Sequence, residues 1–211
     1  MSAYVITGIG TGIGKTLVSA VFTEALQADY YKPIQAGGLR NSDSNFIRKH
    51  ISNTKSVIHP EQYRLKTPAS PHYAAAREGV SIKLKELRLP KTKNKLIVEP
   101  AGGLMVPFND DELYVDWIKK IKLPVILVSD IYLGSINHTL LSVEALKSRN
   151  IEIKGIVFNH SPFQSTEYII TKYTALPVLL QIKKHATLNK KLVMRYADEL
   201  LQNCVRLNIT L

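Results

Sequence analysis

The sequence contains little cysteine, few acidic residues and no long hydrophobic run. Cys204 is the single cysteine among 211 residues, so no disulfide can form within the chain, and a reducing compartment is expected. The N-terminal stretch MSAYVITG lacks the basic segment and the long apolar region of a signal peptide. No window approaches the ~20 apolar residues of a membrane span. We therefore expect a cytoplasmic protein with no membrane partner.

Acidic residues are clearly outnumbered by basic ones. The chain has 28 Lys and Arg against 17 Asp and Glu, which gives a formal net charge of +11. The excess lies in short runs, namely KTKNK at 91–95, KKIK at 119–122, KK at 183–184 and KK at 190–191. Because these runs are not interleaved with aromatic residues, we interpret them as solvated surface and expect no nucleic-acid partner. The positive field would still favour an anionic substrate.

Hydrophobic runs alternate with helical periodicity along the chain. Since 45% of the residues are hydrophobic and no repeat or linker divides the sequence, we expect a single domain over residues 1–211. Continuous apolar runs are typical of strands buried on both faces, so the alternation predicts a mostly parallel α/β sheet flanked by helices. The stretch from 52 to 90 carries four prolines, at 60, 68, 71 and 90, and predicts loops and short helices. Strands are expected at 3–7, 30–32, 96–99, 124–129, 153–158 and 177–180, and helices at 15–26, 43–50, 113–120, 137–147, 166–173 and 188–202.

A glycine-rich loop, GIGTGIGKT at 8–16, joins the first expected strand to the first helix. The standard phosphate-binding pattern Gly-x-x-x-x-Gly-Lys-Ser/Thr would need glycine at position 9, where this chain has Ile9. Counted from Gly8, the loop is one residue longer. Its backbone N–H groups and the helix N-terminus would face a phosphate, Lys15 would reach the β- and γ-phosphates, and Thr16 would meet Mg²⁺. The loop therefore predicts a nucleotide site in a fold like that of P-loop NTPases.

Charged residues follow the second and third expected strands. Lys32 precedes Pro33 at a rigid strand exit, on the same edge as Lys15. Asp43, in NSDS, could either cap the next helix or hold Mg²⁺. Glu99 ends a fully apolar run, where burial requires a cationic partner, either Mg²⁺ or a structural lysine. Thr16, Asp43 and Glu99 together form an oxygen-ligand set that suits Mg²⁺ carried by a nucleotide.

Weaker signals follow the fourth and fifth strands. In GSINH, at 134–138, Ser135 or Asn137 could be the N-cap of a helix whose free N–H groups could hold a carboxylate. We interpret His138 as structural. Asn159, at the end of the fifth strand, could read an adenine edge, because an amide both donates and accepts hydrogen bonds.

Together these stretches resemble the dethiobiotin synthetase family. The resemblance is carried by GIGTGIGKT, KPIQAG, NSD, SPH at 70–72, VEPAGG, LGSINHTLL and GIVFNH. They follow the family's order and spacing from residue 1 to about 160 and fade beyond. The resemblance implies an ATP-dependent cyclo-ligase of biotin biosynthesis. It would make dethiobiotin from 7,8-diaminononanoate and CO₂, use ATP and Mg²⁺, and act as a homodimer.

The resemblance also implies roles for individual residues. The implied catalytic residues are Lys15, Lys32 and Thr11. The implied nucleotide-binding residues are Gly12, Ile13, Gly14, Lys15, Thr16, Leu17 and Asn159, and the implied metal ligands are Thr16, Asp43 and Glu99. The implied substrate-binding residues are Thr11, Lys32, Gly102, Ser135 and Asn137. The GSINH helix start resembles the part that receives the substrate's distal carboxylate from the partner subunit, with Tyr168 assisting.

The sequence departs from the family's pattern at four points. Gly10 and Gly12 stand where the family places acidic residues, and Pro100 stands where it has a glycine. The segment LQIKK, at 180–184, replaces a Gly-Glu-Ile-Pro run that supports the adenine.

An alternative hypothesis is a nucleotide-switched dimeric ATPase of the partition or division-site type, binding DNA or membrane through its basic surface. Such proteins resemble this chain in having a variant loop, but theirs carries an additional lysine near its start. Residues 8–13 contain no lysine. The C-terminal segment also lacks a regular amphipathic basic helix for a membrane surface. We therefore favour the synthetase.

Overall fold

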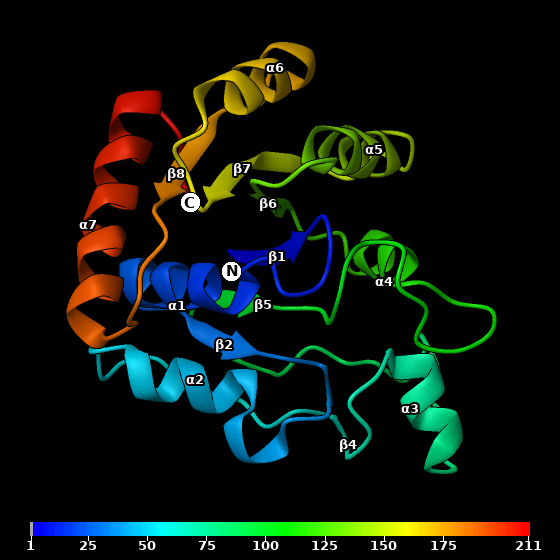
Figure 1. The fold of residues 1–211 in the computed structure, drawn as a ribbon. Coiled ribbons are helices and arrows are strands. Elements are labelled where there is room, and N and C mark those ends of the chain that lie inside the picture. The colour runs from blue at the N-terminus through cyan, green and yellow to red at the C-terminus, as the bar shows by residue number, and fades with distance from the viewer. Residues whose placement is uncertain (1) are drawn as a thin grey trace.

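Six parallel strands form the central sheet, in the order β2-β5-β1-β6-β7-β8 (Figure 1). The computed structural model describes residues 2–211. All neighbouring strands of this sheet run parallel, so their carboxyl ends meet at one edge. The predicted mostly parallel α/β sheet is confirmed. The strands are β1 (Ala3–Gly8), β2 (Asp29–Tyr31), β5 (Leu96–Val98), β6 (Val125–Asp130), β7 (Ile153–Asn159) and β8 (Val178–Ile182).

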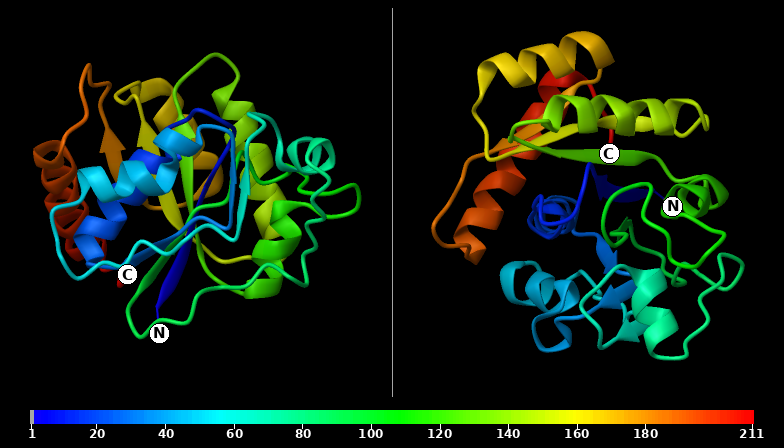
Figure 2. Two further views of the ribbon diagram at one scale, coloured as in Figure 1. Left: turned by 90° about the horizontal axis from the view of Figure 1, so that it is seen from below. Right: turned by 45° about the vertical axis from the view of Figure 1, so that its right-hand side comes forward.

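Helices cover both faces of the sheet (Figure 2). One face packs against α1 (Lys15–Leu26) and α7 (Lys190–Leu207), with α2 (Asp43–His50) beside them. The other packs against α4 (Tyr114–Ile121), α5 (Ser135–Lys147) and α6 (Gln164–Thr174). In β1, Tyr4 and Ile6 join the first core, whereas Ala3 and Val5 join the second. This alternation explains why the strand reads as a continuous apolar run.

A second, two-stranded sheet, which was not predicted from the sequence, lies beside the main one. Its parallel strands are β3 (Ile34–Ala36) and β4 (Tyr63–Leu65), and the short helices η1 (Leu39–Asn41) and α3 (Pro71–Arg77) lie in the same part of the chain. The expected short helices within 52–90 are confirmed by α3, whereas β4 is a strand that was not predicted there. Gln35 and Arg64 stand in the middle of β3 and β4, so neither strand is the continuous apolar run by which β5 was recognised.

Several predicted helix starts shift by one or two residues: α4 begins at 114 rather than 113, α6 at 164 rather than 166, and α7 at 190 rather than 188. Helix α5 begins at Ser135 rather than Asn137, and its N-cap is Gly134, with φ of 98° and no side-chain cap. The expectation that Ser135 or Asn137 caps this helix was therefore wrong, because a glycine turn supplies the left-handed conformation. Helix α7 begins at Lys190, and the Oδ1 of its N-cap Asn189 accepts a 3.0 Å hydrogen bond from the Leu192 N–H.

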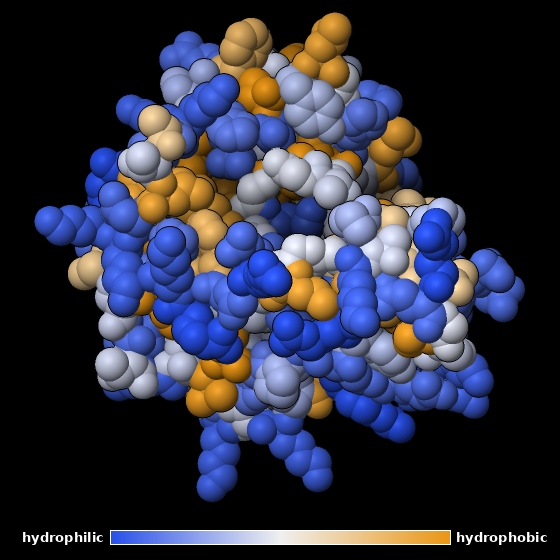
Figure 3. All heavy atoms as spheres, turned by 60° about the horizontal axis from the view of Figure 1, so that its bottom comes forward, coloured by the Kyte–Doolittle hydropathy of each residue, from blue (hydrophilic) through white to orange (hydrophobic). Residues whose placement is uncertain are grey.

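The basic runs lie mostly on the surface. The lysines of KKIK and of both KK pairs are exposed, and so are Lys91 and Lys93, which confirms their interpretation as solvated. Figure 3 shows a face on which hydrophilic residues predominate and hydrophobic ones form scattered groups. Within residues 2–211, no helix is both long and apolar enough to cross a membrane.

Candidate active site

The candidate site lies at the carboxyl ends of three neighbouring strands. The glycine-rich loop follows β1, Lys32 follows β2, and Glu99 follows β5. Since β5 lies between β2 and β1, segments far apart in sequence meet at this edge. A cavity of about 520 Å³ opens there. Of the predicted site residues, it is lined by Thr11, Gly12, Gly14, Lys15, Thr16, Lys32, Asp43, Glu99 and Gly102.

The glycine-rich loop folds back on its own lysine. Lys15 Nζ donates a 2.7 Å hydrogen bond to the Gly10 carbonyl oxygen, and the residue is only 6% exposed. Burial lowers the pKa of the Lys15 ammonium to about 8, although the nearby Glu99 carboxylate opposes this shift. Among residues 2–211, no carboxylate forms an ion pair with this ammonium, so it is available for an incoming phosphate.

Asn159 supports the loop from the neighbouring part of the sheet. Its side chain is buried at the end of β7, and Nδ2 donates a 2.9 Å hydrogen bond to the Ile13 carbonyl oxygen. Gly14 has φ of 87°, and a Cβ at this position would lie 2.1 Å from Asn159 Nδ2. The loop therefore needs glycine at position 14 both for its backbone conformation and for the close approach of Asn159. This contact was not predicted from the sequence, and the predicted contact of Asn159 with adenine stays a prediction.

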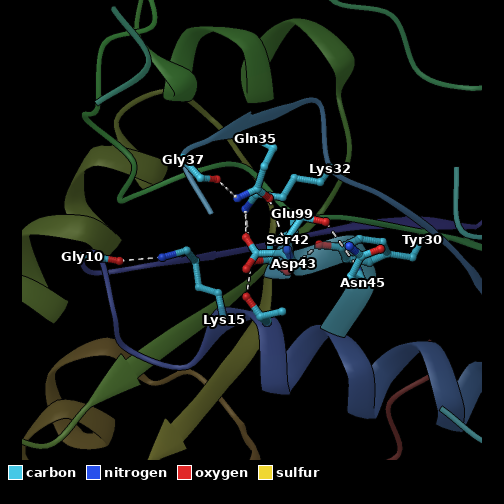
Figure 4. Close-up of polar contacts among 11 residues, drawn as sticks. Gly10, Lys15, Tyr30, Lys32, Gln35, Gly37, Ser42, Asp43, Asn45 and Glu99 are labelled. Atoms are coloured by element: carbon cyan, nitrogen blue, oxygen red, sulfur yellow. Dashed lines mark hydrogen bonds and ion pairs between the residues drawn. The ribbon is translucent and has the colours of Figure 1, made fainter. Parts of the chain in front are cut away.

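Two carboxylates share the Lys32 ammonium (Figure 4). Lys32 Nζ forms an ion pair with Asp43 Oδ2 and lies 3.4 Å from Glu99 Oε1. Burial alone would lower the pKa of Lys32, but the Glu99 and Asp43 carboxylates outweigh it and the pKa is raised. The ammonium therefore keeps its charge, and the expectation that Glu99 contacts a cation is confirmed for Lys32.

The two oxygens of Glu99 have different partners. Oε1, besides facing Lys32, accepts a 2.9 Å hydrogen bond from the Thr16 hydroxyl. Oε2 accepts a 2.9 Å hydrogen bond from the Tyr30 hydroxyl. Glu99 is 1% exposed, so each of these partners offsets part of the cost of burying its charge.

Asp43 is placed by its neighbours and does not cap a helix. The N-cap of α2 is Ser42, whose Oγ accepts a 3.3 Å hydrogen bond from the Asn45 N–H. The capping alternative for Asp43 was therefore wrong. Gln35, which the sequence analysis missed, accepts a 3.2 Å hydrogen bond from the Asp43 N–H and donates one of 3.0 Å to the Gly37 carbonyl. It fixes the turn that brings the Asp43 carboxylate to Lys32.

The oxygen donors around this cluster fit Mg²⁺. Residues 2–211 contain no group of three or more His, Cys, Asp or Glu side chains that could hold a metal ion alone. Mg²⁺ is usually held by one or two carboxylates together with substrate phosphates, and a P-loop adds its hydroxyl. Thr16, Asp43 and Glu99 supply that donor set beside the loop.

Several predicted residues lie outside the main cavity. Ile13 and Leu17 are buried, and Ser135 is buried at the start of α5, where its Oγ accepts a 3.4 Å hydrogen bond from the Tyr132 N–H. Asn137 is exposed on α5, and Tyr168 is 63% exposed on α6. A second groove of about 350 Å³ shares Thr11 with the main cavity and reaches α5; its lining includes Gly103, Met105, His138 and Leu141.

Comparison with known proteins shows the family. A family model described as an AAA domain matches residues 2–191. The ATP-dependent dethiobiotin synthetase BioD of Cytophaga hutchinsonii is 52% identical over 204 residues, covering 96% of this chain and 98% of that protein. The chain belongs to the ATP-dependent dethiobiotin synthetase family. The enzyme of the same name from Christiangramia forsetii is 49% identical over 197 residues, covering 93% of this chain and 95% of that protein.

The comparisons also correct one expectation. The family resemblance was expected to fade beyond residue 160, but the family model extends to 191, and the Cytophaga relative aligns with nearly the whole chain. The β8 and α7 segments therefore belong to the family as well, although LQIKK lacks the expected motif.

Solved structures share the fold at low identity. A plasmid partition protein from Borrelia burgdorferi bound to AMPPNP has a TM-score of 0.60 at 12% identity, over 97% of this chain and 98% of that one. The cell division ATPase MinD of Pyrococcus furiosus has a TM-score of 0.59 at 16% identity, over 96% and 99%. At such low sequence identities these similarities show a common fold and do not support the partition-type alternative.

Proposed function

We propose that the chain carboxylates 7,8-diaminononanoate with CO₂ and closes its ureido ring at the expense of ATP, which makes dethiobiotin for biotin biosynthesis. Family membership supports an ATP-dependent ligase. The observation that carries the proposal is one cavity lined by Lys15 of the phosphate-binding loop and by Lys32 with its two carboxylates. Because ATP is the energy source, we propose the cytoplasm as the compartment.

The reaction needs positioned charge more than a strong base. A neutral substrate amine attacks CO₂ and releases a proton, which gives a carbamate. A carbamate oxygen attacks the γ-phosphorus and ADP leaves. The second amine then attacks the carbonyl carbon of the mixed anhydride, inorganic phosphate leaves with the bridging oxygen, and the ring closes. Positioning and charge neutralisation dominate phosphoryl transfer of this kind.

The side chains divide this work. Lys15, from the loop, would neutralise charge on the β- and γ-phosphates, and the backbone N–H groups of Gly12, Ile13 and Gly14 would cradle them. Lys32, which lines the same cavity, would hold the carbamate beside the γ-phosphate. Thr11 and Gly102 line the same cavity and would contact the substrate near its amines. Gly102 has φ of 69°, a backbone conformation that residues with a side chain rarely adopt, so the turn at this position favours glycine.

Thr16, Asp43 and Glu99 would hold Mg²⁺ at the edge of the phosphate site. The ion would supply positive charge to the β- and γ-phosphate oxygens. Lys32 offsets only one of the two carboxylate charges, so the cluster keeps a net negative charge that favours the ion.

We further propose a homodimer in which α5 of the partner subunit completes the substrate site. Near the start of α5 and along it, Leu133 is fully exposed and Leu141 is 60% exposed, which supports a contact surface here. The helix start with Ser135 and Asn137 would receive the substrate's distal carboxylate across that contact, with Tyr168 nearby on α6.

A product assay tests the proposal. The purified protein is given ATP, Mg²⁺, bicarbonate and 7,8-diaminononanoate, and mass spectrometry is used to find a cyclic urea formed together with ADP. ADP release that is the same with and without the diamine would contradict the proposal and favour a nucleotide switch.

A further inference from the structure

Tyr30 is a buried tyrosine that the mechanism has not used. It lies in the middle of β2 with no exposed surface, and its hydroxyl donates a 2.9 Å hydrogen bond to Glu99 Oε2 (Figure 4). Its backbone is held by the segment at 57–59, because its N–H donates to the Val57 carbonyl at 3.0 Å and its carbonyl accepts from the His59 N–H at 2.9 Å. The other edge of β2 pairs with β5, so the Tyr30 backbone is fixed and the buried ring has little room to move.

We propose that Tyr30 is a positioning residue for the metal ligand Glu99. By occupying Oε2, the Tyr30 hydroxyl leaves Oε1 as the oxygen that faces Thr16 and Lys32. A carboxylate rotates about its Cγ–Cδ bond, so a donor that holds one oxygen fixes the direction in which the other oxygen faces the site. The inference rests on the proposed function, since it takes Glu99 as a ligand of Mg²⁺.

The geometry supports this role over simple filling of the core. The Tyr30 ring packs with the core between the sheet and α1, which an isosteric phenylalanine would also fill. Only the hydroxyl reaches Glu99. Partners of metal ligands that orient the ligand typically change metal affinity 10- to 100-fold when they are removed.

The same strand provides a matched control. Tyr31 follows Tyr30 and points to the opposite face, and its hydroxyl donates a 3.3 Å hydrogen bond to Gln62 Oε1, away from the carboxylate cluster. Tyr31 is 3% exposed. Tyr30→Phe and Tyr31→Phe thus each remove one buried hydroxyl from one strand, but only the first removes a donor to Glu99.

The test measures metal binding directly. Mn²⁺, in place of Mg²⁺, is titrated into each folded protein with AMPPNP kept below the protein concentration, and the electron paramagnetic resonance spectrum of protein-bound Mn²⁺ is compared with that of Mn²⁺ and AMPPNP without protein. We expect the Mn²⁺ dissociation constant of Tyr30→Phe to rise about tenfold or more, with that of Tyr31→Phe unchanged. Excess Mg²⁺ should also restore much of the lost turnover of Tyr30→Phe.

Two results would count against the inference in different ways. Equal Mn²⁺ binding by the parent protein and by Tyr30→Phe, even with a lower melting temperature, would overturn the role of Tyr30 alone. Absence of Mn²⁺ binding in the parent protein with AMPPNP would refute the proposed metal site itself, and the inference with it. If Tyr30→Phe yields no folded protein, Tyr30→Met, which also removes the donor to Oε2 and stays apolar, carries the same expectation, and unaltered binding there would again overturn the role.

Discussion

The Lys32 ammonium lies 3.4 Å from Glu99 Oε1, and both side chains are almost fully buried. Asp43 forms a second ion pair with the same ammonium. One cation thus offsets part of the negative charge of two carboxylates. Removing either sign of charge leaves the other buried without compensation, so this cluster connects stability with activity.

Lys32→Ala should impair both turnover and folding. Turnover should fall about 10²- to 10³-fold or more, because a fixed positive charge near the transferred phosphoryl group is lost. The free energy of unfolding should fall by about 3–5 kcal/mol, since Asp43 and Glu99 lose their shared partner. Steady-state kinetics and urea unfolding measure the two effects. Lys119→Ala, which removes an exposed lysine of α4, is the control, and near-normal turnover of Lys32→Ala would contradict the proposed role.

Lys15→Met should impair turnover alone. Without nucleotide, Lys15 is buried with a carbonyl as its hydrogen-bond partner, and burial lowers its pKa to about 8. Its charge therefore opposes folding, and a methionine of similar length should not lower the free energy of unfolding of the nucleotide-free protein. Turnover should still fall by at least about 10²-fold. The same two assays apply, and a large loss of stability would show that Lys15 has a structural partner we have not identified.

Asn159→Ala should weaken the phosphate-binding loop, because the hydrogen bond to the Ile13 carbonyl is lost. The affinity for inorganic tripolyphosphate, which lacks the adenine base, should fall several-fold, because one net hydrogen bond is worth ~1 kcal/mol. Calorimetry measures this affinity. Asn203→Ala, which removes a similar bond to the Leu179 carbonyl, is the control. A variant that binds tripolyphosphate normally but ATP weakly would instead limit Asn159 to the adenine contact.

Asp29→Asn should destabilise the edge strand β2 in a pH-dependent way. Burial alone would raise the pKa of Asp29, but hydrogen bonds from Thr92, the Val57 N–H, His59 and Asn94 outweigh it and lower the pKa. With a lower pKa in the folded state, the carboxylate adds stability above its unfolded pKa of about 4, and that stability is lost as the pH falls through the folded pKa. We expect a loss of about 1–3 kcal/mol at pH 7 that shrinks below about pH 4.

Urea unfolding across this pH range, with the exposed Asp110→Asn as control, measures the effect. An equal difference between the parent protein and Asp29→Asn at pH 7 and pH 3 would show that charge is not the cause.

Much of the fold and part of the site could be predicted from the sequence, because the signals were local. Continuous apolar runs marked the six strands of the main sheet, and the loop motif fixed the edge at which Lys15, Lys32 and Glu99 converge. The strands β3 and β4 were missed because a polar residue, Gln35 or Arg64, interrupts each short apolar run. The start of α5 was misplaced because Gly134 adopts the capping conformation through its backbone, which polar side-chain signals do not reveal.

The partners of the site residues could not be predicted. Tyr30 meets Glu99 across 69 positions of sequence, and Asn159 meets Ile13 across 146. Such contacts follow from the strand order, which brings segments that are distant in the chain together at one edge of the sheet. The alternation of Tyr30 and Tyr31 in β2 shows that the sequence can indicate opposite faces, but not which face carries the carboxylate.

The proposed chemistry is tested most directly by the fate of one oxygen atom. In the mixed anhydride, an oxygen from CO₂ bridges carbon and phosphorus, and ring closure expels it with phosphate. The protein is therefore mixed rapidly with ATP, Mg²⁺, 7,8-diaminononanoate and ¹⁸O-labelled CO₂, and the phosphate is analysed by mass spectrometry. We predict one ¹⁸O in the phosphate released with each cyclic urea formed. Unlabelled phosphate, released without a cyclic urea and independently of the diamine, would contradict the proposed function.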